Sequence, residues 1–266
     1  MSQLLVHPSG PDAQGRIHSV TPQSAGWSYV GFDVYRLKKG ARITKKTEGR
    51  EGCLVLLSGK ARVTSGALDT GEIGGRSSPF EADPWSVYVP AQSEWTLEAA
   101  SDCEVAVCTA PATGKLPPRI IAPKDVGQET RGTGTNTRYV RNILPEGKEA
   151  ESLLVVEVIT PPGHWSSYPP HKHDRDALPD ESLLEETYYH RIKPSQGFAL
   201  QRVYTDDRSL DETLAARDGD VVLVPKGYHP VGAPHGYEVY YLNVMAGPKR
   251  TWRFHNDPDH EWLMKK

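Results

Sequence analysis

The sequence has few of the features that mark secreted, membrane-spanning or nucleic-acid-binding proteins. Cysteine occurs only three times, at Cys53, Cys103 and Cys108; this odd, sparse set beside apolar runs indicates buried thiols in a reducing cytoplasm. No apolar run approaches the roughly 18 residues of a membrane span. The opening stretch MSQLLVHPSGPDAQGR lacks the basic and apolar regions of a signal peptide. The formal net charge is only −3, which favours neither nucleic acid nor membrane as a partner. We therefore expect a cytoplasmic protein.

Long helical periods are also scarce, while glycine (24) and proline (22) are plentiful. Short apolar or alternating runs bounded by turn residues recur about every ten residues, which is typical of a β-sandwich or barrel. The clearest runs are residues 27–37, 52–57, 86–89, 104–109, 137–143, 153–159, 187–192, 197–204 and 237–245. Only residues 176–184 and the tail from Trp252 onward are expected to contain helix. The predicted class is all-β.

Similar sequence patterns in the two halves of the chain predict two domains. Residues 83–90 and residues 218–225 each consist of a polar turn followed by an apolar strand that ends in proline. Glu51 and Glu186 each precede a strand that ends at a glycine turn. Such duplication is a clue to the fold. The segment of residues 111–127, rich in proline and lysine, is interpreted as a connection between domains, which gives the boundaries 1–125 and 126–266.

The chemistry of the chain centres on His171 and His173 in the sequence PPHKHD. In an extended segment a His-x-His pair places both imidazoles on one face, because strand side chains alternate. A lone pair of this kind could equally be a solvated polar loop. Glu186 opens the next apolar run, and His229 follows the strand that ends in Pro-Lys-Gly-Tyr. Three imidazoles and one carboxylate suit a borderline divalent metal ion.

Two sets of motifs resemble known families. The order Gly, His-x-His, Glu, strand, Gly, then Gly-x5-Pro-x-Gly-x-His resembles the two cupin motifs of a small double-stranded β-helix barrel. The strings SAGWSYVGFDVYRL, GHWSSYPPHKHD, LEETYYHRI and VLVPKGYHPVGAPHGYEVYYLNVMAGPKRTW resemble the 5-deoxy-glucuronate isomerase family of myo-inositol catabolism. That family is bicupin and similar to 5-keto-4-deoxyuronate isomerase. Two details depart from the general cupin pattern: the twelve residues between His173 and Glu186, and Ala233 in place of an asparagine.

The resemblance implies two cupin barrels and one divalent metal ion, Zn, Mn or Fe, held in the second barrel by His171, His173, Glu186 and His229. From the residues alone, Glu185 competes with Glu186, since alternation turns only one of them inward. His235 likewise competes with His229, although it follows a turn-like Gly-Ala-Pro. In the first half the position matching His-x-His is occupied by Lys45-Lys46-Thr47, so we expect no such metal there.

The implied reaction is the aldose–ketose isomerisation of 5-deoxy-D-glucuronate to 5-dehydro-2-deoxy-D-gluconate. A divalent metal would polarise the carbonyl group and stabilise an enediolate. A positioned acid or base would contribute roughly 10²–10⁴-fold, and the motif does not identify it. The candidates that we select for this role are Glu185, Tyr241 and Lys172, and Asp174 is a further one.

The carboxylate of a uronate needs a cationic partner, best supplied by a forked guanidinium. Arg175, Arg202 and Lys226 are the predicted substrate-binding residues, and Arg250 is a further candidate. Two other functions fit a cupin with this set of side chains: another metal-dependent enzyme, such as a dioxygenase or a related uronate isomerase, and a non-catalytic sugar-binding protein. A small-molecule uronate is the expected partner, and cupins commonly self-associate, so a homo-oligomer is a further expectation.

Overall fold

The computed structural model describes residues 2–264 and consists mainly of β-strands. Within these residues helical structure is confined to α1 (Pro22–Ala25) and the 3₁₀ segments η1 (Pro123–Asp125), η2 (Gly134–Asn136) and η3 (Pro258–Met264). None of the described helices is long and apolar enough to cross a membrane. The prediction of an all-β protein is confirmed.

The chain forms two compact units that are not continuous in sequence. The N-terminal unit consists of Pro8–Gly127 and Arg141–Val155. The C-terminal unit consists of Met1–His7, Gln128–Val140 and Val156–Lys266. The expected domain boundary after residue 125 stays a prediction.

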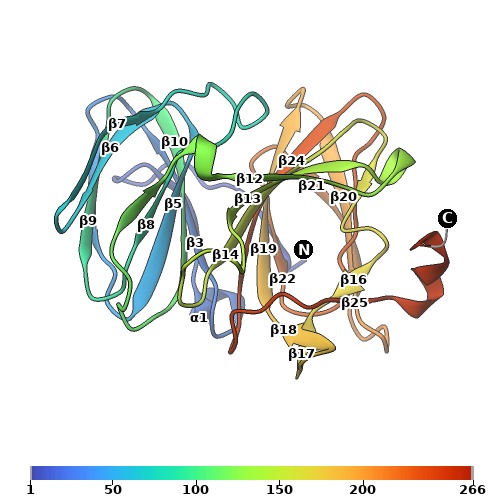
Figure 1. Ribbon diagram of the computed structural model, residues 1–266. Helices are drawn as coiled ribbons and strands as arrows, with labels where there is room; N and C mark the ends of the chain where they lie inside the picture. The colour runs from blue at the N-terminus through green and yellow to red at the C-terminus, as the bar shows by residue number, and fades with distance from the viewer. Residues whose placement is uncertain (1, 265–266) are drawn as a thin grey trace. The chain divides into compact units, whose positions relative to one another are not determined.

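The N-terminal unit contains two antiparallel sheets. The larger has the order β11 (Arg119–Ile121), β8 (Ser86–Val89), β5 (Arg50–Ser58), β10 (Cys103–Pro111), β3 (Gly31–Leu37) and β2 (Arg16–Val20). The smaller has the order β4 (Arg42–Lys46), β9 (Glu94–Ala99), β6 (Lys60–Ser65) and β7 (Leu68–Gly74). Figure 1 shows β6, β7 and β9 forming one wall of this unit, and side chains such as Leu54, Val63 and Leu97 from the two sheets fill one core between them. The three cysteines are buried and free, as expected. Strand β11 pairs with β8, so the expected connecting segment contributes to this sheet.

The C-terminal unit repeats this arrangement. Its larger sheet has the order β1 (Leu5–Val6), β22 (Val221–Val224), β19 (Glu185–Lys193), β24 (Glu238–Ala246), β14 (Leu154–Thr160), β13 (Arg138–Leu144) and β12 (Gly127–Arg131). Its smaller sheet has the order β15 (Trp165–Ser166), β23 (Val231–Gly232), β20 (Phe198–Tyr204) and β21 (Asp211–Arg217). The succession β22-β19-β24-β14 matches β8-β5-β10-β3 in the N-terminal unit. The internal duplication predicted from the sequence is therefore present in the strand order.

Two short ribbons complete the C-terminal unit. β16 (His171–Lys172) pairs with β25 (His255–Asn256), and β17 (Asp174–Ala177) pairs with β18 (Glu181–Leu183). Figure 1 shows β16 beside β25 near the C-terminal end of the chain. The expectation of helix in residues 176–184 is wrong, because these residues form the β17–β18 hairpin. The tail contains a strand before its 3₁₀ segment.

Candidate metal centre

Strand β19 lies between β22 and β24 and carries the buried carboxylate of Glu186. Side chains alternate along a strand, so Glu186, Tyr188 and His190 share one face. The rings of Tyr188 and His190 stack with their centroids 6.1 Å apart, and the ring of Tyr188 lies 5.8 Å from that of His229. By the same alternation Glu185 points to the opposite face. Of the two adjacent glutamates, Glu186 is therefore the one that faces the histidines.

His173, Glu186 and His229 form a compact group of possible metal ligands. One ligand atom from each residue lies within 4.8 Å of the others, and all three side chains are buried. Oε2 of Glu186 is 3.1 Å from Nε2 of His173 and 3.2 Å from Nε2 of His229. This group contains three of the four residues predicted from the sequence.

Backbone carbonyl groups determine which nitrogen of each imidazole faces Glu186. Nδ1 of His173 lies 3.0 Å from the carbonyl oxygen of Leu184, and Nδ1 of His229 lies 2.8 Å from that of Gly227. A carbonyl oxygen can only accept, so each Nδ1 donates a proton and the neutral ring keeps a lone pair on Nε2. Metal-binding histidines commonly show this arrangement.

Two lone pairs aimed at one carboxylate oxygen repel it unless a cation or added protons lie between them. Nε2 of His229 has no hydrogen-bond partner among the described residues. A buried polar atom without a partner is costly, and a divalent cation bound by both Nε2 atoms and the Glu186 carboxylate would satisfy it. The donor set therefore fits a metal of the Zn, Mn or Fe type.

The charges in the group shift the pKa values of its members. Burial alone would raise the pKa of Glu186, but when protons on the facing imidazoles take the place of a metal ion, the charge of His229 and the hydrogen bond from His173 lower it to about 2. Burial alone would lower the pKa of His173, but the hydrogen bond and charge of Glu186 raise it above its usual value. For His171, burial and the two neighbouring histidines lower the pKa well below its usual value. His171 is therefore neutral and able to donate a lone pair.

His171 lies beside the group rather than inside it. Its ring centroid is 4.9 Å from that of His229 and 6.4 Å from that of His173. Its backbone pairs with Asn256 in β25, and its ring lies 4.7 Å from that of Phe254. The tail thus holds the segment that carries His171. The role of this histidine as a fourth ligand stays a prediction.

The three residues predicted for catalysis lie in different surroundings. Tyr241, in β24, is buried and its ring lies 4.9 Å from that of Tyr188 on the interior face. Glu185 is buried on the other face of β19. Nζ of Lys172 is buried between carboxylates, at 2.8 Å from Asp174, 3.4 Å from Glu181 and 3.2 Å from Asp206. Only Tyr241 lines the cavity at the metal centre that Glu186 and His171 also line.

The three cations predicted to bind the substrate are placed away from this cavity. Arg175 donates to Glu181 at 2.7 Å. Both Nε and Nη2 of Arg202 lie 2.7 Å from the carboxylate oxygens of Asp211. Lys226 is exposed, and none of the three lines either cavity next to His171. Their substrate-binding role stays a prediction without support from these contacts.

Sequence reasoning missed two other arginines, Arg131 and Arg138. Both line a cleft of about 480 Å³ outside His171, and both also line the inner cavity at Glu186. One signal could have identified Arg138: it lies two residues before the buried Val140 in β13, and side chains two apart in a strand share a face.

The chain matches the KduI/IolB family over residues 4–263. It belongs to that family. Among curated relatives, a 5-deoxy-glucuronate isomerase of Geobacillus kaustophilus is 60% identical, over 100% of this chain and 96% of the relative. Another, of Bacillus subtilis strain 168, is 49% identical over the full length of both chains. The family resemblance predicted from the motifs is confirmed.

Solved structures agree with this family and with its fold. An IolB-like protein from Salmonella typhimurium matches with a TM-score of 0.96 and 53% identity, over 98% of this chain and 99% of that one. An oxalate decarboxylase from Lactobacillus farciminis matches with a TM-score of 0.67 at 14% identity, over 100% of this chain and 91% of that chain. At this low identity the likeness concerns the fold, which is the predicted bicupin of two double-stranded β-helix barrels.

Proposed function

We propose that this protein is a 5-deoxy-glucuronate isomerase that converts 5-deoxy-D-glucuronate to 5-dehydro-2-deoxy-D-gluconate in myo-inositol catabolism. Full-length relatives of that name share 49–60% of its residues. The observation that carries the proposal within this chain is the buried group of His173, Glu186 and His229 beside a cavity lined by Tyr241 and two arginines. The cytoplasm remains the proposed location, and self-association remains an expectation.

His173, Glu186 and His229 would hold one divalent cation, Zn, Mn or Fe, with His171 as the proposed fourth ligand. When bound, such an ion would act as a Lewis acid: it would polarise a carbonyl oxygen and stabilise the negative charge that develops on it during isomerisation. The chain supplies the orientation of the imidazoles through the carbonyl oxygens of Leu184 and Gly227. It also lines the cavity with the buried rings of Tyr188 and Tyr241.

The reaction moves one hydrogen from the hydroxyl-bearing carbon to the aldehyde carbon, and one proton between the two oxygens. Burial raises the pKa of Tyr241, so its hydroxyl group stays protonated at neutral pH and acts as a donor. We assign to Tyr241 the donation of a proton to the carbonyl oxygen of the substrate and the recovery of a proton from the neighbouring hydroxyl group, so that one proton moves between the two oxygens and the tyrosine ends neutral. Tyr188 has its hydroxyl group 3.0 Å from Oγ of Ser167 and keeps the ring of Tyr241 in place.

The test is an isomerase assay with 5-deoxy-D-glucuronate and D-glucuronate as substrates. The protein is first treated with a chelator, and Zn, Mn and Fe are then added back separately. We expect turnover of 5-deoxy-D-glucuronate well above that of D-glucuronate, loss of turnover after chelation and recovery with at least one metal. An absence of ketose product with every metal would overturn the proposed activity. Full activity of protein shown by elemental analysis to be metal-free would overturn the role of the metal.

A further inference from the structure

Arg138 is a half-buried cation that contacts no carboxylate group in the described part of the chain. Its Nη1 donates to the carbonyl oxygens of Asn136, at 3.0 Å, and Tyr168, at 3.2 Å. Within residues 2–264 no carboxylate oxygen lies within 4.0 Å of its guanidinium group, and its Nε and Nη2 donate no hydrogen bond. A charge removed from water without a counter-charge is costly. An anion from outside the chain would offset this cost.

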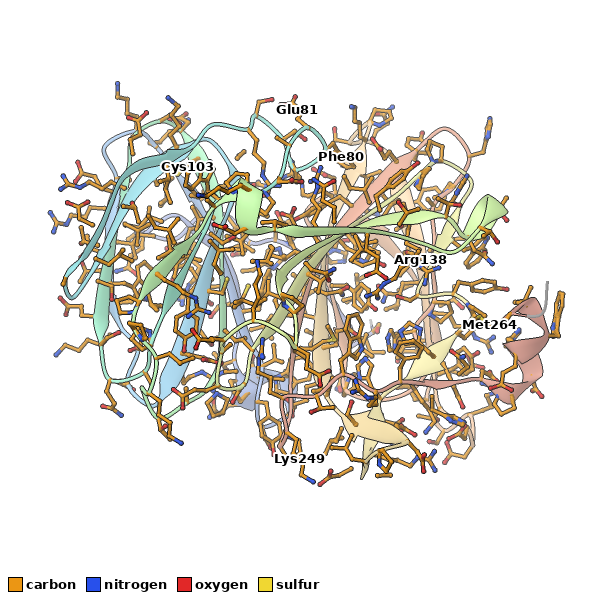
Figure 2. All side chains as sticks on the ribbon, in the orientation of Figure 1. Phe80, Glu81, Cys103, Arg138, Lys249 and Met264 are labelled. Carbon is orange, nitrogen blue, oxygen red and sulfur yellow. The ribbon has the colours of Figure 1, made fainter. Side chains whose placement is uncertain are left out.

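The surroundings of Arg138 place that anion next to the metal centre. Arg138, Arg131 and His171 form part of the wall of both the outer cleft and the inner cavity, which also contains Glu186 and Tyr241. In Figure 2 Arg138 lies among the side chains inside the C-terminal unit, whereas Lys249 extends away from its strands. The outer cleft, at about 480 Å³, is within the usual range for a small-molecule site.

Arg131 adds a second positive charge to the same wall. Its guanidinium carbon lies 5.0 Å from the centre of the Trp252 ring, which orients it. Nη2 of Arg131 is 3.0 Å from a carboxylate oxygen of Glu129, whose side chain is 46% exposed. An exposed pair of this kind is weak, so an incoming carboxylate can compete with Glu129. Arg202, by contrast, is already bound through two nitrogens to Asp211.

We propose that Arg138, assisted by Arg131, forms the subsite that binds the carboxylate group of the sugar acid. This inference rests on the proposed function, because it assigns the aldehyde end of the substrate to the His173–Glu186–His229 group and the acid end to the arginines. A guanidinium group presents donors in a fork that matches a carboxylate, which an ammonium group does not. The subsite therefore selects acids over neutral sugars of the same length.

The experiment compares two substrates: 5-deoxy-D-glucuronate and 5-deoxy-D-glucose, in which a hydroxymethyl group replaces the carboxylate. For Arg138→Met we expect kcat/KM for the acid to fall about 10- to 100-fold, the range expected for hydrogen bonds to a charged group. Most of this loss should be in KM, while activity on the neutral sugar and the metal content stay unchanged. Arg138→Lys should recover only part of the loss, and Arg131→Met should show a smaller loss. Arg62→Met is the matched control and should not change the preference for the acid, because Arg62 is an exposed arginine of the N-terminal unit that pairs with Asp69.

An equal loss on both substrates, or no loss on either, would overturn the subsite. Thermal melting identifies a variant that fails to fold. If Arg138→Met does not fold, the same comparison of the two substrates is made with Arg138→Lys, for which a loss on the acid alone is expected. A binding measurement separates this inference from the proposed function. D-gluconate and the neutral D-sorbitol are titrated into the metal-loaded protein by calorimetry. If the wild-type protein has no isomerase activity but binds D-gluconate in preference to D-sorbitol, and Arg138→Met does not, the function fails and the subsite stands.

Discussion

The backbone N–H of Gly227 donates a hydrogen bond of 2.9 Å to Oδ2 of Asp174. This bond joins the two segments that carry the histidines, because Asp174 follows His173 and Gly227 precedes His229 by two residues. The other carboxylate oxygen of Asp174 accepts from Nζ of the buried Lys172 at 2.8 Å. Through Asp174, Lys172 is thus connected to both segments, and its contacts stabilise their relative positions.

Gly227 should not tolerate a side chain. Its φ of +89° lies in the left-handed region, and a Cβ there would collide with the carbonyl oxygen of Tyr204. We expect Gly227→Ala to lower metal affinity and to destabilise the protein by more than the ~1–2 kcal/mol of left-handed strain alone. Gly236→Ala is the control, because Gly236 has a φ of +85° and open space around its Cβ position. Calorimetric metal titration and thermal melting measure both effects; equal behaviour of the two variants would contradict the prediction.

Removal of His229 should empty the metal centre without unfolding the barrel. His229→Ala deletes one of the two Nε2 donors that face Glu186, so metal content should fall from about one ion per chain to a small fraction, and turnover should be lost. His235→Ala is the control, since His235 is exposed in a turn. Elemental analysis and circular dichroism make the comparison. A His229→Ala protein that retains its metal and its turnover would remove this residue from the site.

Tyr241→Phe should reduce kcat by roughly 10²–10⁴-fold, the usual contribution of general acid–base catalysis. It keeps the ring and its packing against Tyr188, so metal content and KM should change little. Tyr139→Phe is the control, because Tyr139 is 50% exposed and follows the opposite alternation in β13. Steady-state kinetics decides, and an unchanged kcat in Tyr241→Phe would assign the proton donation to another group.

The effect of pH on stability should have opposite signs with and without metal. In the metal-free protein the raised pKa of His173 gives a stabilisation that is complete below its unfolded pKa of about 6.5 and is lost as pH rises through the folded pKa. The lowered pKa of Glu186 gives a stabilisation that is present above about 4.3 and is lost as pH falls toward about 2.

Bound metal reverses the first of these trends, because protons compete with the ion for His173. The increase in Tm on adding metal should therefore grow between about pH 5 and pH 8. Melting curves with chelator and with metal across this range measure the difference. A difference that shrinks with rising pH would contradict the protonation states described for His173 and Glu186.

The sequence predicted those parts of the site that depend on local periodicity. Alternation placed Glu185 and Glu186 on opposite faces of one strand, and the turn after Val224 placed His229 at a strand end. These are properties of single strands. The sequence alone did not determine whether Glu185 or Glu186 faces the histidines. The register of β19 against β22 and β24 determines the orientation of Glu186.

The substrate-binding arginines depend on pairing between strands, which a single sequence does not specify. Arg202 was selected because it lies in a strand near the metal strand, but Asp211 on the neighbouring β21 neutralises it. Arg138 was not predicted because what distinguishes it is that no carboxylate on a neighbouring strand pairs with it, and the sequence does not show this. The helix expected in residues 176–184 failed for a similar reason: the buried Glu181 accepts bonds from the Asp174 N–H and from Arg175, and these tertiary bonds hold an extended hairpin.

The pairing of β16 with β25 has a consequence for the order in which the protein matures. His171 and Lys172 form a strand only by pairing with His255 and Asn256. In addition, the Asp257 N–H donates to the carbonyl oxygen of Pro170. A ribosome delivers these partners only after every proposed ligand has already emerged. The segment that bears His171 therefore reaches its final geometry late in synthesis, so a nascent chain released before Asp257 would lack a finished metal centre.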